Sequence, residues 1–72
     1  MLSRIMNAQQ YRKALERLGL TQVAAGQLLD VGPRTSRRYA LDEAKIPMPV
    51  TILLRLLLKK RIRLEDIESA KG

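Results

Sequence analysis

The sequence predicts an all-α domain of five short helices, and two observations support that fold class. Apolar residues recur at intervals of three and four, and no stretch sustains the alternation of apolar and polar residues that a strand needs. The chain has 72 residues, of which 46% are hydrophobic, so it can fold but has no room for a second domain. We therefore expect residues 1–72 to form one helical domain.

The first helix is expected to follow Asn7, whose side chain can cap it, with Gln10 completing a capping box. The residues that would face the core then have helical spacing and comprise Tyr11, Ala14, Leu15 and Leu18. We expect Tyr11 to lie in the core with its hydroxyl at the edge. Gly19 fits the left-handed position that ends such a helix.

Two more helices are predicted directly afterwards, joined by a tight turn. Thr21 can cap a helix from Gln22 to about Leu29. Residues 30–32 then form the turn, and Pro33 suits the first position of a helix that runs to about Ala40 or Leu41. Two short helices joined in this way, the second of them basic, are typical of a helix-turn-helix, here at about residues 21–41.

The last two helices are predicted from the prolines and the apolar residues that follow them. Residues 42–48 are expected to form a loop, since Pro47 and Pro49 interrupt helical structure. A fourth helix should begin at Pro49 or Val50 and end near Arg61. A short fifth helix is expected over Leu64–Ala70.

The chain is strongly basic, with 14 Lys and Arg against 7 Asp and Glu and a formal net charge of +7. This balance favours a nucleic acid or an anionic membrane surface as the partner. Arg55 interrupts the longest apolar run, so no membrane-spanning segment is expected. Residues 1–6 lack the pattern of a signal peptide, and we expect the protein in the cytoplasm.

Catalysis is not expected, because the chain has neither histidine nor cysteine and no clustered pair of acids. The absence of thiolate and imidazole ligands also argues against a zinc site. The sequence therefore indicates no enzyme, no cofactor and no small-molecule ligand.

The third predicted helix concentrates positive charge on one side. Arg34, Arg37 and Arg38 fall within an arc of roughly 100°, and Ser36, Tyr39 and Ala40 occupy the opposite side. An ordinary solvated face is the alternative, but such faces usually carry both signs of charge, and no acid occurs between Val31 and Leu41. Two tyrosines with no Phe or Trp offer little stacking surface, which argues against RNA.

The order of residues through this region resembles a known family. The pattern Gln22-x-x-Ala25-x-x-Leu28-Leu29-x-Val31-x-x-Arg34-Thr35-x-Arg37-Arg38-Tyr39, preceded by Leu15-x-x-Leu18-Gly19-Leu20-Thr21, is similar to that of the Cro/CI/Xre proteins. The resemblance covers about residues 8–62 and implies the five-helix lambda-repressor-like fold. The chain also looks like the short regulators associated with anti-CRISPR genes.

The resemblance implies a role for each matching residue at double-stranded DNA. Pro33, Arg34 and Arg37 would face the major groove, with Arg34 the best candidate to read a base. The residues expected at phosphates are Gln22, Thr35, Arg38 and Tyr39, although Tyr39 can equally belong to the core.

Three residues depart from the family pattern. Gly26 replaces an alanine where the two helices approach closely, and Asp30 replaces the glycine of the turn. Ser36 replaces a buried aliphatic residue, so we expect looser packing beneath the third helix.

The fourth predicted helix carries more apolar residues than a small monomer can cover. Only Thr51, Arg55 and Lys59 form a polar stripe along it. A homodimer would bury this surplus and would predict a palindromic operator. The expected interface, within residues 49–70, comprises Leu54, Leu57, Leu58, Ile62, Leu64 and Ile67. The alternative is that these residues are simply core.

Together these features predict a sequence-specific regulator that represses its own operon, typical of phage and mobile elements. The alternative is an antitoxin-type module, whose apolar fourth helix would bind a toxin. The cations of the segment Lys59-Lys60-Arg61-x-Arg63 are expected to complement the dipole at a helix end and not to bind DNA primarily, with secondary contacts to phosphates as the alternative.

Overall fold

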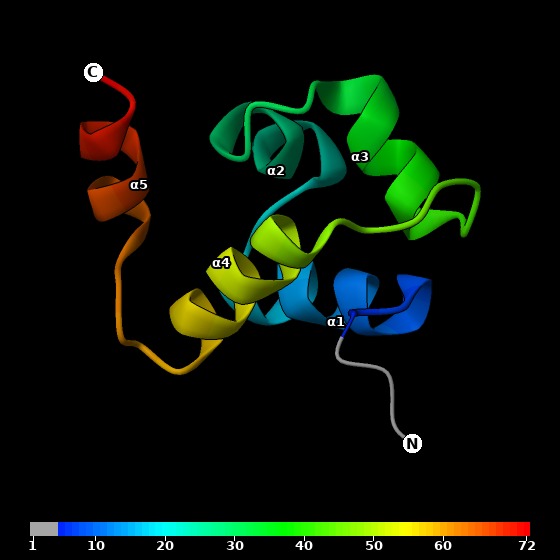
Figure 1. The fold of residues 1–72 in the computed structure, drawn as a ribbon, viewed down its shortest axis with the longest axis horizontal. Coiled ribbons are helices and arrows are strands. Elements are labelled where there is room, and N and C mark those ends of the chain that lie inside the picture. The colour runs from blue at the N-terminus through cyan, green and yellow to red at the C-terminus, as the bar shows by residue number, and fades with distance from the viewer. Residues whose placement is uncertain (1–4) are drawn as a thin grey trace.

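The computed structural model describes residues 5–72, and within that range it contains five α-helices and no strand (Figure 1). They are α1 (Ala8–Leu18), α2 (Gln22–Leu28), α3 (Pro33–Ala40), α4 (Met48–Leu58) and α5 (Leu64–Ala70). The predicted all-α class is therefore confirmed. Residues 1–4, which belong to the segment expected not to be a signal peptide, lie outside the described residues.

The five helices pack around one hydrophobic core, and each of them contributes buried residues to it. α2 and α3 pack against each other on one side, and α1 contacts both α3 and α4 on the other. α5 contacts α2 and lies at the opposite end of the molecule from α3. None of the helices described over residues 5–72 is long and apolar enough to cross a bilayer.

Local signals set both ends of α1, as the sequence predicts. The Asn7 side chain accepts the Gln10 N–H at 2.8 Å, and the Gln10 side chain accepts the Asn7 N–H at 2.9 Å. At the other end Gly19 adopts φ of 70°, and the Leu20 N–H bonds to the Leu15 carbonyl at 2.8 Å. These bonds satisfy backbone groups that every helix end leaves without partners.

The turn between α2 and α3 closes around Gly26. Its carbonyl accepts the N–H groups of Val31 and Gly32 at 3.0 and 3.2 Å. A Cβ on residue 26 would collide with the Gly32 carbonyl oxygen and lie 2.7 Å from its carbon. Asp30 adopts a left-handed φ of 57°, which aspartate tolerates better than most residues. This turn fixes where α3 begins.

α4 differs from its prediction at both ends. It begins at Met48, within the expected loop, and ends at Leu58 rather than near Arg61. Lys60 adopts φ of 59°, and the Arg61 N–H bonds back to the Leu56 carbonyl at 3.0 Å. A left-handed residue cannot continue a right-handed helix, so α4 stops earlier than its cationic sequence suggests.

The prediction that Thr51 belongs to a polar stripe on the surface of α4 is wrong. This residue is fully buried, and its hydroxyl accepts the Met6 N–H at 3.1 Å. The segment before α1 crosses α4 at this point and covers the threonine. Thr51 therefore joins two distant parts of the chain and does not face solvent.

A bulkier residue at position 26 should open the turn that positions α3. We expect Gly26→Ala to lower the free energy of unfolding by about 1–3 kcal/mol, because the new methyl meets backbone that cannot move aside easily. Urea unfolding followed by circular dichroism measures the change.

Gln27→Ala is the matched control, since residue 27 lies on the exposed side of the same helix. It should change stability by less than about 0.5 kcal/mol. Equal stability of Gly26→Ala and the native chain would contradict this account of the turn.

Candidate nucleic-acid interface

α3 is a helix with one charged side and one packed side. Arg34, Arg37 and Arg38 are all exposed, as their spacing predicts. On the opposite side Ser36 and Ala40 are fully buried. The helix therefore presents three guanidinium groups to solvent while its other side forms part of the core.

These guanidinium groups are not neutralised by acids. Within residues 5–72 the ion pairs join Arg63 to Glu65 and Lys71 to Glu68, and none involves α3. Arg38 donates to the Glu43 backbone carbonyl at 3.3 Å, which leaves its charge intact. An arginine without an acidic partner keeps its charge, and every guanidinium N–H that no protein group accepts can donate to an external acceptor.

The other residues implied at DNA differ in accessibility. Pro33 is exposed at the first position of α3, and Gln22 is half-buried at the first position of α2. Thr35 is half-buried on the side of α3. Tyr39 is only 5% exposed, so of its two predicted roles the structure supports core packing, and its assignment to phosphate is corrected.

A buried hydrogen bond fastens α3 to α1. The Tyr11 hydroxyl and the Ser36 hydroxyl lie 2.5 Å apart, and both side chains are fully buried. The Tyr11 ring also packs edge-on against Tyr39, with ring centroids 5.6 Å apart and planes at 80°. The expectation that the Tyr11 hydroxyl lies at the edge of the core is therefore wrong, because Ser36 provides a partner for it inside.

A second contact holds the far end of α3. Arg12, in the first half of α1, donates to the Ala40 carbonyl at 2.5 Å. That carbonyl is one of the four that a helix leaves without a partner at its C-terminus, and a cation there also complements the dipole. This role of Arg12 could not be predicted from the sequence, since 28 residues separate the two partners and no local pattern connects them.

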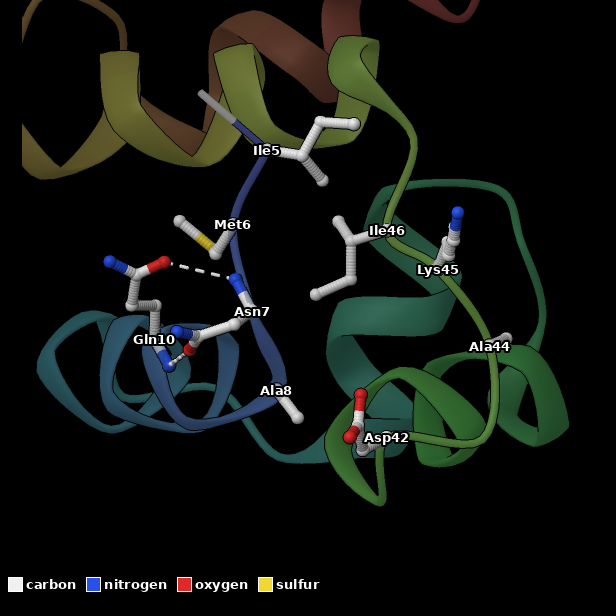
Figure 2. Close-up of a pocket in the computed structure, with 9 residues that line it drawn as sticks. All are labelled: Ile5, Met6, Asn7, Ala8, Gln10, Asp42, Ala44, Lys45 and Ile46. Carbon is white, nitrogen blue, oxygen red and sulfur yellow. Dashed lines mark hydrogen bonds between the residues drawn. The ribbon is translucent and has the colours of Figure 1, made fainter. Parts of the chain in front are cut away.

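A hollow of about 450 Å³ lies beside α3, between the segment before α1 and the loop that leads to α4 (Figure 2). Its polar residues Asn7 and Gln10 already bond to each other (Figure 2). Asp42 and Lys45 stand on the loop side, and apolar side chains such as Ile46 complete the lining. Among the described residues no group of three or more His, Cys, Asp or Glu side chains could hold a metal ion.

The predicted dimer interface is corrected at three of its six residues. Leu54, Leu57 and Ile67 are 0%, 5% and 8% exposed and belong to the core of the monomer. They face inward because helical periodicity shows that a helix has an apolar side but not which side the rest of the chain covers. The other three remain accessible to some degree: Leu58, Ile62 and Leu64.

Comparison of the chain with protein-family models, with curated proteins and with solved structures finds no match.

Removing either hydroxyl beneath α3 should destabilise the domain. Tyr11→Phe leaves the buried Ser36 hydroxyl without a partner, and we expect a loss of about 1–3 kcal/mol in the free energy of unfolding. Ser36→Ala should act similarly, and the double variant should lose about 1 kcal/mol less than the sum of both. Urea unfolding of the four proteins gives this coupling energy, and a value of zero would contradict the bond.

Stability should also fall at alkaline pH because of Tyr11. Burial raises the pKa of its hydroxyl above the ordinary 10.0, the Ser36 hydrogen bond lowers it in part, and Tyr39 raises it further. The unfolded chain therefore ionises first as the pH rises. The stabilisation from neutral Tyr11 is complete below pH 10 and disappears as the pH rises through the folded-state pKa.

Unfolding measured at several pH values should show the native chain losing more stability above pH 10 than Tyr11→Phe does. Parallel curves for the two proteins would show that Tyr11 does not ionise on unfolding in this range.

Proposed function

We propose that the protein binds double-stranded DNA through the outer side of α3 and acts in the cytoplasm as a transcription regulator. The observation that carries the proposal is the combination on one helix of three exposed, unneutralised arginines with a packed inner side. Arginine can bond bidentately to guanine in the major groove, whose width admits an α-helix. The lambda-repressor-like arrangement of α2 and α3 is part of this proposal.

The fixed position of α3 favours sequence-specific contacts with bases over non-specific electrostatic binding to the phosphate backbone. Tyr11 and Arg12 bond to α3 near its middle and at its C-terminal end, and Gly26 accepts from the turn before it. A helix held at three points does not have to be ordered when DNA binds, which favours tight and specific complexes.

Each candidate residue has a distinct role in the proposed complex. Arg34 and Arg37 would read base edges with Pro33 beside them, and Arg38, Thr35 and Gln22 would contact phosphates. Phosphate contacts set position and affinity, whereas base contacts set sequence preference. A homodimer on a palindromic operator would place two α3 helices one DNA turn apart and block polymerase, as a repressor of its own operon does.

A second candidate is an antitoxin-type module that binds a protein as well as DNA. The observation in its favour is a hollow of about 500 Å³ between α2, α4 and α5, whose lining includes the apolar side chains of Leu53, Leu56 and Ile62. The mass of the purified chain discriminates the two, since a stable dimer without any partner favours the regulator.

Replacement of Arg34 should weaken recognition of a preferred sequence. We expect Arg34→Ala to cost about 1–3 kcal/mol on that sequence and to relax preference at one base position. Arg38→Ala should weaken binding to all sequences alike and lower the slope of log affinity against log salt by about one. Selection from a random pool of duplexes, followed by titration at several salt concentrations, measures both effects.

Arg63→Ala is the matched control, because it removes an exposed arginine directly before α5, which lies at the other end of the molecule from α3. It should leave the preferred sequence unchanged. If Arg34→Ala bound selected and random duplexes as the native chain does, the assignment of Arg34 would be wrong.

A further inference from the structure

A second cluster of cations lies away from the arginines of α3, where α1 and α4 meet. Lys13 and Arg17 extend from α1, Arg55 extends from α4, and Lys59 caps the C-terminal end of α4. They line two adjoining hollows of about 270 and 480 Å³, which share Arg17, Arg55 and Leu58. No acid lines either hollow. We name the four cations and Leu58 the cationic hollow.

The cationic hollow is electrostatically unfavourable in an isolated monomer. Its cations are spaced four residues apart on each helix, and like charges at that spacing repel. None of the four forms an ion pair with any residue of the 5–72 range. Between the cations the lining is mainly apolar, with the half-buried Leu58 beside Ala14 and Met6, and Gln10 is its one uncharged polar residue. Such a hollow suits a ligand that combines negative charge with an apolar side chain.

The outward side of α5 has that composition. Leu64, Glu65 and Glu68 fall within an arc of roughly 100°, and all three are exposed. Leu64 is 37% exposed, although it is a large apolar residue. The two carboxylates form only local ion pairs at 3.5 and 3.7 Å with Arg63 and Lys71, and the side chains of the first pair are more than 70% exposed. Pairs this exposed are weak and exchange readily.

The α5 helix cannot reach the cationic hollow of its own chain. Ile67, one turn after Leu64 at the inward edge of the same helix, is 8% exposed and belongs to the core. Lys71 also donates to the Gln27 carbonyl, which fastens the end of α5 to α2. The outward side of α5 and the cationic hollow are therefore complementary surfaces that one copy cannot bring together.

We infer that the outward side of α5 docks into the cationic hollow of a second copy, so that two reciprocal contacts close a homodimer. Leu64 meets Leu58, and Glu65 and Glu68 meet the lysines and arginines around it. A second copy fits better than a second duplex, because the phosphate backbone of DNA offers no apolar group for the apolar part of the lining. These contacts would hold together the homodimer of the proposed function, and they do not require α3 to bind DNA.

Charge reversal on each side tests the docking by sedimentation velocity at low salt without DNA. The native chain should be a dimer that dissociates as salt is added. Arg17→Glu and Glu65→Arg should each associate more than about tenfold more weakly, since each creates two repulsive contacts in its own dimer. Lys59→Glu provides a second reversal in the hollow, and circular dichroism checks that every variant folds.

Mixing the two variants provides the decisive measurement. Arg17→Glu and Glu65→Arg should form a heterodimer together, because one of its contacts is native and the other has both charges reversed. Lys45→Glu is the matched control, since it makes the same charge change at an exposed residue outside the hollow and should remain dimeric.

Three results would overturn the inference: a monomeric native chain, a dimer that Arg17→Glu leaves intact, or no assembly in the mixture. Weaker duplex binding by Arg17→Glu with an unchanged mass would assign the cationic hollow to DNA instead. Because mass is measured without DNA, failure of the dimer is distinguishable from failure of the α3 interface.

Discussion

The hydrogen bond between the Tyr11 and Ser36 hydroxyls is the contact on which the arrangement of α3 depends. Both side chains are fully buried, so each hydroxyl needs a hydrogen-bond partner, and the two hydroxyls bond to each other. An aliphatic residue at position 36 could pack in several ways, whereas a hydroxyl bonds its partner in one orientation. The direction of this hydrogen bond, together with side-chain packing, therefore sets the orientation of α3. The orientation of the helix in turn determines which way its three arginines point.

The features that could be predicted from the sequence are those set by neighbouring residues. Asn7, Gly19 and Pro33 act within one helical turn, so their types alone locate the ends of α1 and the beginning of α3. The spacing of Arg34, Arg37 and Arg38 likewise places them on one side without knowledge of the rest of the chain. The all-α class follows from the same short-range rules.

Contacts between distant residues could not be predicted in this way. Met6 and Thr51 are 45 residues apart, and Tyr11 and Ser36 are 25 apart. Thr51 has the spacing of a solvent-facing stripe, but it is fully buried and its hydroxyl accepts the Met6 N–H. Leu54 and Leu57 lie in the core of the monomer and not at the predicted dimer interface. The apolar pattern of a helix does not reveal which of its sides the rest of the chain covers.

The chain contains two tyrosines and no Phe or Trp, and the two rings contact each other where α3 packs against α1. The intrinsic tyrosine fluorescence of the protein therefore originates entirely from the contact between α3 and α1. A spectroscopist can follow undocking of α3 without attaching any dye, since emission from elsewhere in the protein does not obscure the signal.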